Sequence, residues 1–474
     1  MSARETYRQE LSRSLSVREN IFITLSSVTP ASSLFIIVPA LITGLAGGGV
    51  AAMLVAGVIA VFVGLCYAEL ASRYPITGGE YAWAARLLGK PLGFGVFMLS
   101  LVSGVLIIVV IASGVGPYLS VVWSGFDSAW TPILVILVTT VIASLTISTN
   151  AWVTGVCLAL EMIAAVVLVV LGLSHISRGI GAFVTPQTIA MPGHLGPVTW
   201  GVLFSLVPVA LFAYNGYGAS VYYAEETKAA SRTMGRAIMV SLLISVLAEL
   251  VPLMAVILGS SSMSALVGSS APLNYFLLDR GGHTVNILVS IGIAIAVFKA
   301  VIAIQIQIAR LVFASARDRS WPDAVDRLLG KIDNRTHTPI AATILIGVVA
   351  AASGYWVPFS WLLTATGASV VVIYAVVAVA AVAALRVRGK NAAVRPGYRM
   401  PLWPVPPVIV ILIMAYVVYQ YITTGIAPLV VSAVTLLVGV AWYYLFIHPR
   451  RGERWTLPDP QDDEGDRAPE TSLV

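Results

Sequence analysis

The chain has 474 residues, of which 58% are hydrophobic and 11% charged, and its mean hydropathy is +0.91. Soluble domains carry about 25% charged residues, so this composition excludes a soluble protein and predicts a polytopic membrane protein. The formal net charge of +6 suits Lys and Arg gathered on cytoplasmic loops, and we expect no nucleic-acid partner. The 2 cysteines lie in apolar runs and the 5 histidines show no ligand spacing, so neither a disulfide framework nor a metal site is expected.

Apolar runs of about 20 residues, the length that spans a bilayer as a helix, occur twelve times. A polar N-terminal segment, residues 1–20, precedes them and does not have the shape of a cleavable signal peptide. The runs predict an all-α protein with about 12 transmembrane helices, at 21–46, 48–71, 91–117, 130–149, 152–174, 198–224, 234–259, 284–312, 339–356, 360–386, 402–424 and 427–447.

Basic residues fall on alternate loops between these runs. If the N-terminus is cytoplasmic, the cytoplasmic loops include the basic segments Arg310 to Arg335 and Arg386 to Arg399, whereas the outer loops hold only Arg178 and Arg280. This asymmetry predicts an even number of helices with both termini in the cytoplasm, and we expect the plasma membrane as the location. The segment 448–474 is rich in Pro, Asp and Glu, and we expect it to be a disordered cytoplasmic tail.

A polar break interrupts the first run at Pro30. Because lipid cannot hydrogen-bond a backbone, such a break is tolerated only where it is buried in protein or lines a watery cavity. The break exposes a half-helix N-terminus that suits a carboxylate, which predicts a binding site; a simple proline kink is the alternative. The candidate substrate-binding residues here are Ser27, Thr29, Ala31, Ser32 and Ser33.

An inverted repeat with five helices in each half places a matching break in the sixth run. That run contains Gly216 and Gly218, which are poor helix formers, next to the amide of Asn215. A small-residue packing face is the alternative, but two breaks at matched positions favour one shared site. The candidate substrate-binding residues here are Phe212, Ala213, Tyr214, Asn215 and Gly216.

Four short motifs stand in order along most of the chain, after the second and sixth runs, at the end of the eighth and before the eleventh. They read Cys66-Tyr67-Ala68-Glu69-Leu70-Ala71-Ser72-Arg73-Tyr74-Pro75 with Thr77-Gly78-Gly79-Glu80-Tyr81, Glu225-Glu226-Thr227-Lys228, Ala309-Arg310 with Ala316-Arg317-Asp318 and Trp321-Pro322, and Arg395-Pro396-Gly397-Tyr398 with Pro401-Leu402-Trp403-Pro404. Together they resemble motifs of the amino acid–polyamine–organocation superfamily of transporters, and of its amino acid permeases in particular.

The resemblance implies a LeuT-like fold in which helices 1 and 6 are broken. It implies a substrate site between helices 1, 3, 6, 8 and 10, where the backbone at the two breaks meets the carboxylate and amine of an amino acid. Phe212 would stand near the aromatic residue that closes over the substrate. The first break departs from the family's glycine-rich turn, because it reads Pro30-Ala31-Ser32-Ser33. The implied transporter domain, 21–447, consists of inverted repeats at about 21–174 and 198–386 and two extra C-terminal helices at 402–447.

Ionisable residues inside spans cost at least about 2.5–3.5 kcal/mol each and are therefore functional candidates. Glu161 lies midway along the fifth run and Lys299 midway along the eighth. In the implied fold both flank the first half of helix 1, where relatives bind sodium. We expect Lys299, paired with Glu161, to replace the sodium ion and carry proton coupling; a fixed structural pair and two separate aqueous pockets are the alternatives. Glu249, late in the seventh run, is expected near the outer interface, reaching solvent.

These observations favour an amino acid permease that works by alternating access, with proton symport first. Sodium symport, exchange, and a polyamine or organic amine permease are the alternatives, and a receptor without transport is the least favoured. No acidic residue lies in the broken segments, which favours a neutral amino acid; Phe212, Tyr214 and Tyr217 would suit an organic cation instead. The sequence contains no catalytic constellation, and we expect neither enzyme activity nor a cofactor.

Overall fold

The structure is a computed structural model of the 474-residue chain. Most of the predicted N-terminal segment 1–20 and of the predicted tail 448–474 lies outside the described residues, as do Thr77 and the start of the motif at Arg395. The structure describes residues 15–455, except 76–77, 146–150, 192, 334, 337, 387–397, 451 and 453.

In the described part of the chain, 10 helical segments are long and apolar enough to cross a membrane, and two shorter apolar helices accompany them. They follow the runs that hydropathy predicts, which confirms an all-α polytopic membrane protein. The ten segments are α1 (Val17–Val28) with α2 (Pro30–Ile36) and α3 (Val38–Leu45), α4 (Gly48–Arg73), α6 (Lys90–Ser113) with α7 (Val115–Leu119), α9 (Ala151–Ser174), α10 (Trp200–Ala213) with η3 (Tyr217–Glu226), α11 (Ala230–Gly259), α13 (Pro272–Arg317), α16 (Phe359–Arg386), α17 (Val405–Thr424), and α18 (Ala427–Trp442) with η4 (Tyr443–Ile447) and η5 (His448–Arg450); the shorter two are α8 (Trp130–Leu145) and α15 (Ile340–Trp356).

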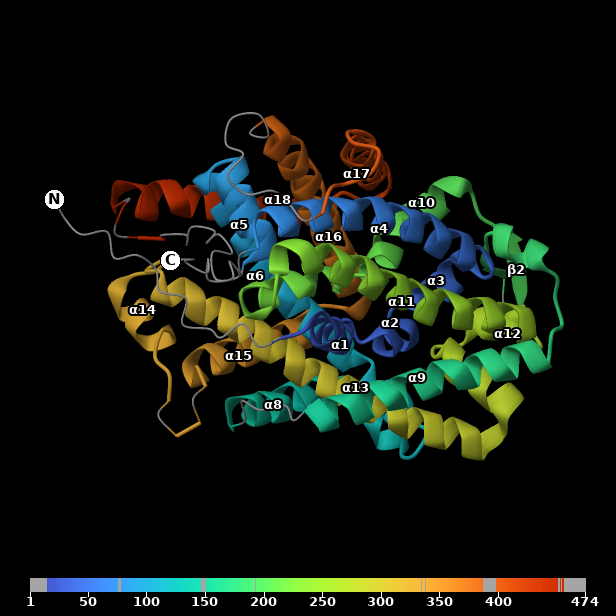
Figure 1. Ribbon diagram of the computed structural model, residues 1–474. Coiled ribbons are helices and arrows are strands. Elements are labelled where there is room, and N and C mark those ends of the chain that lie inside the picture. Colours follow the sequence, from blue (N-terminus) through green and yellow to red (C-terminus); the bar gives the residue numbers. More distant parts are fainter. Residues whose placement is uncertain are drawn as a thin grey trace, which may run out of the picture.

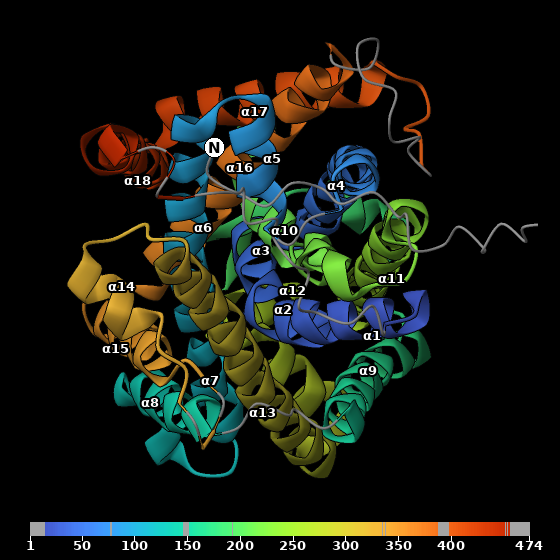
Figure 2. The same ribbon diagram turned by 60° about the vertical axis from the view of Figure 1, so that its left-hand side comes forward.

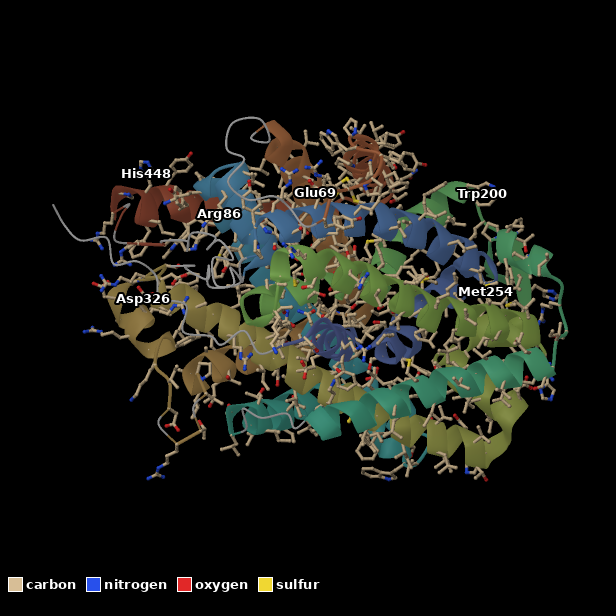
Figure 3. The ribbon with its side chains drawn as sticks, viewed as in Figure 1. Glu69, Arg86, Trp200, Met254, Asp326 and His448 are labelled. Atoms are coloured by element: carbon tan, nitrogen blue, oxygen red, sulfur yellow. The ribbon has the colours of Figure 1, made fainter. Side chains whose placement is uncertain are left out.

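Short elements between the spans lie at the two ends of the bundle (Figure 1). A small antiparallel hairpin, which the sequence did not predict, lies with α12 at one end, and α5 and α14 lie at the other. The hairpin is tied to α3, because the Thr188 hydroxyl donates to the Thr43 carbonyl at 3.1 Å. Charged Arg86 and Asp326 lie at the α5 end and Trp200 at the hairpin end (Figure 3). These elements are α5 (Gly79–Leu87), η1 (Ser124–Phe126), η2 (Ile180–Val184), β1 (Gln187–Met191), β2 (His194–Pro197), α12 (Met263–Gly268) and α14 (Asp323–Leu329).

α13 extends beyond the predicted run 284–312, because a helical segment from Pro272 precedes it. Gly282 joins the two parts with φ 75° and ψ 179°, a backbone conformation that glycine adopts without steric conflict. In Figure 2, α13 crosses the molecule obliquely, and it packs against α2, α6 and α9. The helix therefore reaches both the interior of the bundle and its far end.

The interior of the bundle holds the first broken span. All seven residues of α2 are buried, and α2 packs against α9, α11 and α13. Glu249 of α11 is also fully buried, with an exposed fraction of 0%. The predicted solvent-facing position of Glu249 is therefore wrong, because α11 packs against α4 and α9 and encloses that face of the helix.

Part of the predicted disordered tail is folded against the bundle. Arg454 is buried, and its guanidinium donates to the Asp323 carboxylate at 2.5 Å. Trp455 is buried as well, and its backbone N–H donates to the Asp318 carbonyl at 2.7 Å. The prediction of disorder from residue 448 onward is therefore wrong for these two residues, because each finds partners on the loop around α14. It is also wrong for His448–Arg450, which form η5.

Candidate functional site

The first span is interrupted between α1 and α2. α1 ends at Val28, Thr29 takes a left-handed backbone conformation (φ 48°, ψ 63°), and α2 begins with Pro30. Pro30 lacks an N–H and suits the first position of a helix, so it starts α2 and does not continue α1. Thr29 is β-branched and strained in this region of the Ramachandran plot, so the surrounding packing must hold it there. The span therefore presents two helix ends inside the bundle.

The sixth span is interrupted in the same part of the bundle. α10 ends at Ala213, and the 3-10 helix η3 begins at Tyr217 after a turn in which Gly216 has φ 116°. A Cβ atom on Gly216 would lie 3.1 Å from Val28 Cγ2 and 3.2 Å from Val28 Cα. Glycine is required here both by the positive φ and by this close approach. The two interruptions therefore touch each other.

A cavity of about 130 Å³ lies between the two interruptions. Hydroxyl and amide groups from the interruptions and from α6 line it, together with aliphatic and aromatic side chains of α6, α13 and α16. Its wall includes Ser27, Thr29, Ser33, Ser103, Ile107, Phe212, Asn215, Gly216, Gln307, Ile373 and Tyr374. A small molecule with both polar and apolar parts would find partners for each in this cavity.

The predicted substrate-binding residues divide into two groups. Six of them line the cavity: Ser27, Thr29, Ser33, Phe212, Asn215 and Gly216. The other four are buried outside its wall: Ala31, Ser32, Ala213 and Tyr214. The Tyr214 ring lies beside Gly57 of α4 and is not part of the cavity wall. An interruption changes the direction in which successive side chains point, so spacing alone could not assign them.

Lys299 of α13 and Glu161 of α9 lie at the first interruption. Lys299 Nζ donates to the Ser26 carbonyl at 2.8 Å, at the end of α1. The Glu161 carboxyl group lies near the Ala31 backbone N–H, at the start of α2. Both side chains are buried, with exposed fractions of 8% for Lys299 and 1% for Glu161. They are close enough to interact electrostatically, although no ion-pair contact within 4.0 Å joins them in the described residues. The structure thus brings the two predicted coupling residues to one place.

The two charges complement the helix ends that they contact. The C-terminal end of a helix carries partial negative charge on its free carbonyls, and the N-terminal end carries partial positive charge on its free N–H groups. Lys299 faces the end of α1, and Glu161 faces the start of α2. Lys299 therefore supplies a hydrogen bond that the end of α1 cannot form within the helix, and Glu161 places a carboxyl group near the free N–H groups of α2.

Glu80 is a cavity residue whose role the sequence did not indicate. It lies on α5, outside the spans, yet its side chain lines the same cavity. Its Oε1 accepts from the Tyr67 hydroxyl at 2.8 Å, and its Oε2 accepts from the Tyr222 hydroxyl at 3.0 Å. Desolvation raises the pKa of Glu80, and these two hydrogen bonds oppose that rise. The only feature of the sequence that singles out Glu80 is its place in the motif Thr77 to Tyr81, and that motif does not indicate whether its side chains are buried.

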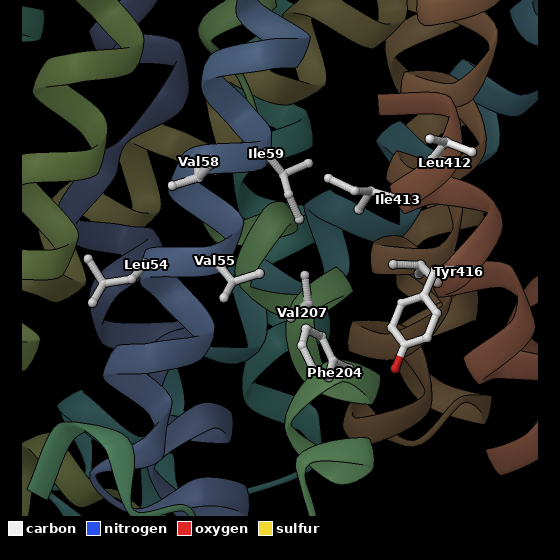
Figure 4. Close-up of a pocket in the computed structure, with 10 residues that line it drawn as sticks. Leu54, Val55, Val58, Ile59, Phe204, Val207, Leu412, Ile413 and Tyr416 are labelled. Atoms are coloured by element: carbon white, nitrogen blue, oxygen red, sulfur yellow. The ribbon is translucent and has the colours of Figure 1, made fainter. Parts of the chain in front are cut away.

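A larger and almost entirely apolar pocket of about 510 Å³ lies away from the interruptions (Figure 4). It is formed by side chains of α4, α10 and α17, including Leu54, Phe204 and Leu412. Leu54 and Leu412 are exposed on the flank of the bundle, where lipid would cover them. The Tyr416 hydroxyl is the one side-chain polar group among its lining residues, so this pocket is a poor candidate for the functional site. Among the described residues, no three His, Cys, Asp or Glu side chains gather to hold a metal ion.

Comparisons with known proteins agree with this geometry. The model of a protein family described as amino acid permease matches residues 15–448. The branched-chain amino acid permease BcaP of Lactococcus lactis subsp. cremoris is 25% identical over 428 residues, which cover 86% of this chain and 88% of that protein. An uncharacterised transporter of Mycobacterium tuberculosis is 30% identical over 346 residues, 72% of this chain and 74% of its own. The vacuolar cationic amino acid transporter 4 of Arabidopsis thaliana is 27% identical over 324 residues, 64% of this chain and 51% of its own.

Proposed function

The chain belongs to the amino acid permease family, and from that premise we propose that it moves an amino acid across the plasma membrane by alternating access. Its family and relatives are permeases, so the protein is a transporter and not an enzyme. The observation that carries the mechanism is the contact between two interrupted spans, Gly216 against Val28, beside one buried polar cavity. Interrupted helices at membrane depth are stable where they line such a cavity.

The cavity wall supports a neutral amino acid as the substrate. The hydroxyls of Ser27 and Thr29 and the amide of Asn215 offer hydrogen bonds, and Thr29 Oγ1 has no partner within the described residues. Buried polar atoms without partners are rare in proteins, so this hydroxyl is available to a ligand. Ile107 and Ile373 would contact an apolar side chain. The name of the Lactococcus relative, a branched-chain amino acid permease, favours the same substrate class.

Proton symport is the coupling that we propose, with Lys299 and Glu161 as the coupling pair. Lys299 places its ammonium group on the Ser26 carbonyl, where a bound cation would otherwise satisfy the open end of α1. A proton added to Glu161 or lost from Lys299 would remove one charge of a buried pair, which weakens the contacts across the interruption. Sodium symport and exchange without protons are the competing modes.

We further propose the predicted topology, two inverted repeats of five helices with both termini in the cytoplasm. Both ends of the described chain are anchored beside the cytoplasmic loops of that topology. Leu15 pairs with Thr227 just before α11, and Trp455 bonds to Asp318 just after α13. The α5 end of the bundle, where Figure 3 places Arg86, would then face the cytoplasm.

The test is uptake by the purified full-length protein in proteoliposomes free of sodium. Counterflow is measured with a panel of neutral and cationic amino acids, polyamines and amines, and uptake is then repeated with an inward proton gradient. We expect counterflow of neutral amino acids and acceleration of net uptake by the gradient. Counterflow without acceleration would overturn proton symport, and no uptake of any amino acid on the panel would overturn the transport function.

A further inference from the structure

Glu80 lines the cavity between the two interruptions, at the end of the cavity nearest α5. It is carried by α5, which lies at one end of the bundle in Figure 1, and Arg86 of the same helix is labelled at that end in Figure 3. The interrupted spans contribute Ser27 and Asn215 to the same cavity wall. A carboxyl group therefore stands where the cavity meets the α5 end of the molecule.

Three elements meet at this carboxyl group. Tyr67 comes from α4 and Tyr222 from η3, the segment that follows the interruption of the sixth span. Tyr217 of η3 and Tyr374 of α16 also interact electrostatically with Glu80. Tyr81 of α5 interacts with Tyr222, and α6 contributes the hydroxyl of Ser103 to the shared cavity. Phenols and hydroxyls are neutral at physiological pH, so none of these groups balances a negative charge.

We propose, on the premise that the protein is a proton-coupled transporter, that Glu80 is a proton-binding group at the α5 end of the cavity. It holds a proton while Tyr67 and Tyr222 enclose it, and it releases that proton when η3 separates from α4 and α5. Glu80 is thereby a second titratable site, separate from Lys299 and Glu161, and it acts on the opposite interrupted span.

The direction of the coupling follows from linkage. Burial raises the pKa of Glu80 in the described conformation, whereas solvent around a separated Glu80 would return the pKa to its ordinary value. The enclosed conformation therefore binds the proton more tightly, so low pH stabilises it and high pH favours separation. If the α5 end faces the cytoplasm, a high internal pH promotes both opening and proton release on that side.

Additional support comes from Tyr374, which connects the carboxyl group to the interruption of the sixth span. Its hydroxyl donates to Asn215 Oδ1 at 3.2 Å, and its ring packs on Tyr67 and Tyr217. Asn215 lines the cavity, so a substrate that contacts this amide is connected through Tyr374 to the aromatic cluster that encloses Glu80. Substrate binding and proton binding therefore share one set of packed side chains.

The experiment measures net uptake at fixed external pH while the internal pH is varied from about 5 to 8, in proteoliposomes sorted for one orientation. Three variants are compared with the wild type: Glu80→Gln, Tyr222→Phe, and Tyr421→Phe as the matched control. Tyr421 is a buried tyrosine of α17 whose hydroxyl donates to the Thr364 carbonyl, away from the cavity. Counterflow at symmetric pH is recorded for every preparation.

We expect wild-type uptake to rise with internal pH, and Glu80→Gln to keep counterflow but lose this dependence. Tyr222→Phe removes a hydrogen bond that favours the ionised form, so the midpoint of its pH profile should move to higher pH than in the wild type. Tyr421→Phe should keep the wild-type midpoint. If uptake by Glu80→Gln depends on internal pH as wild-type uptake does, the proposal is overturned. If Glu80→Gln shows no counterflow, Tyr222→Phe decides: a midpoint equal to that of the wild type overturns the proposal. Absence of counterflow in the wild type instead overturns the proposed function.

Discussion

Replacing Lys299 with methionine removes the positive charge at the first interruption while keeping an apolar side chain of similar length. The variant loses the bond to the Ser26 carbonyl and leaves Glu161, which is 1% exposed, without the cation beside it. Leaving the buried Ser26 carbonyl without its donor costs about 1–3 kcal/mol, or roughly fivefold to a hundred-and-fiftyfold in the folding equilibrium. Replacing both buried charges together often leaves stability unchanged. We therefore expect the double variant Lys299→Met/Glu161→Gln to recover most of this loss of stability.

Thermal unfolding in detergent compares the stabilities, with Arg310→Met as the control. Arg310 is an exposed cation of the same helix, and its replacement should change stability by no more than about 0.5 kcal/mol. On the same preparations we expect the double variant to exchange substrate in counterflow but not to accumulate it in a proton gradient. Gradient-driven accumulation by the double variant would refute the coupling role of the pair. A single variant as stable as the wild type would refute the reasoning from burial.

Three further variants test other contacts. Gly216→Ala should lower the free energy of unfolding by about 1–3 kcal/mol and abolish most uptake, because φ 116° strains alanine and the new Cβ meets α1. Gly425→Ala is the control: an added Cβ there meets nothing within 4 Å, so neither stability nor uptake should change. Glu249→Leu removes a buried carboxyl whose oxygens have no hydrogen-bond partner in the described residues, so thermal unfolding should occur at an equal or higher temperature; a clear fall would contradict this. Arg454→Met loses the bond to Asp323, so amide hydrogen exchange in α14 should accelerate about tenfold to a hundredfold, and unchanged exchange would show that Arg454 does not hold α14.

The spans could be predicted because a bilayer requires about 20 apolar residues and the chain supplies them in separate blocks. Pro30 and Gly216 could be singled out because their backbone limits are local properties of the residue. The hairpin β1–β2 and the start of α13 before Gly282 could not be predicted in the same way. Their structure depends on contacts with the ends of the bundle, which no local pattern of hydropathy records.

The directions of individual side chains were beyond the sequence. Position along the seventh run placed Glu249 near an interface, but its burial is decided by α4 and α9 packing around α11. Tyr214 belongs to the second interruption, yet its side chain faces α4, because the turn redirects it. Glu80 lies outside every apolar run and could be placed at the cavity only once α5 is seen to fold against α6, α16 and η3.

Each interrupted span is held by a different ionisable site. Lys299 binds the end of α1 at the first interruption, with Glu161 near the start of α2, and Glu80 binds η3 after the second. The two interruptions contact each other through Val28 and Gly216, so a large displacement of either one requires the other to adjust. Under the proposed mechanism, a change in protonation at one site therefore alters the packing at the other. A transport cycle could then couple proton release at Glu80 to rearrangement around Lys299 without any direct contact between the two groups.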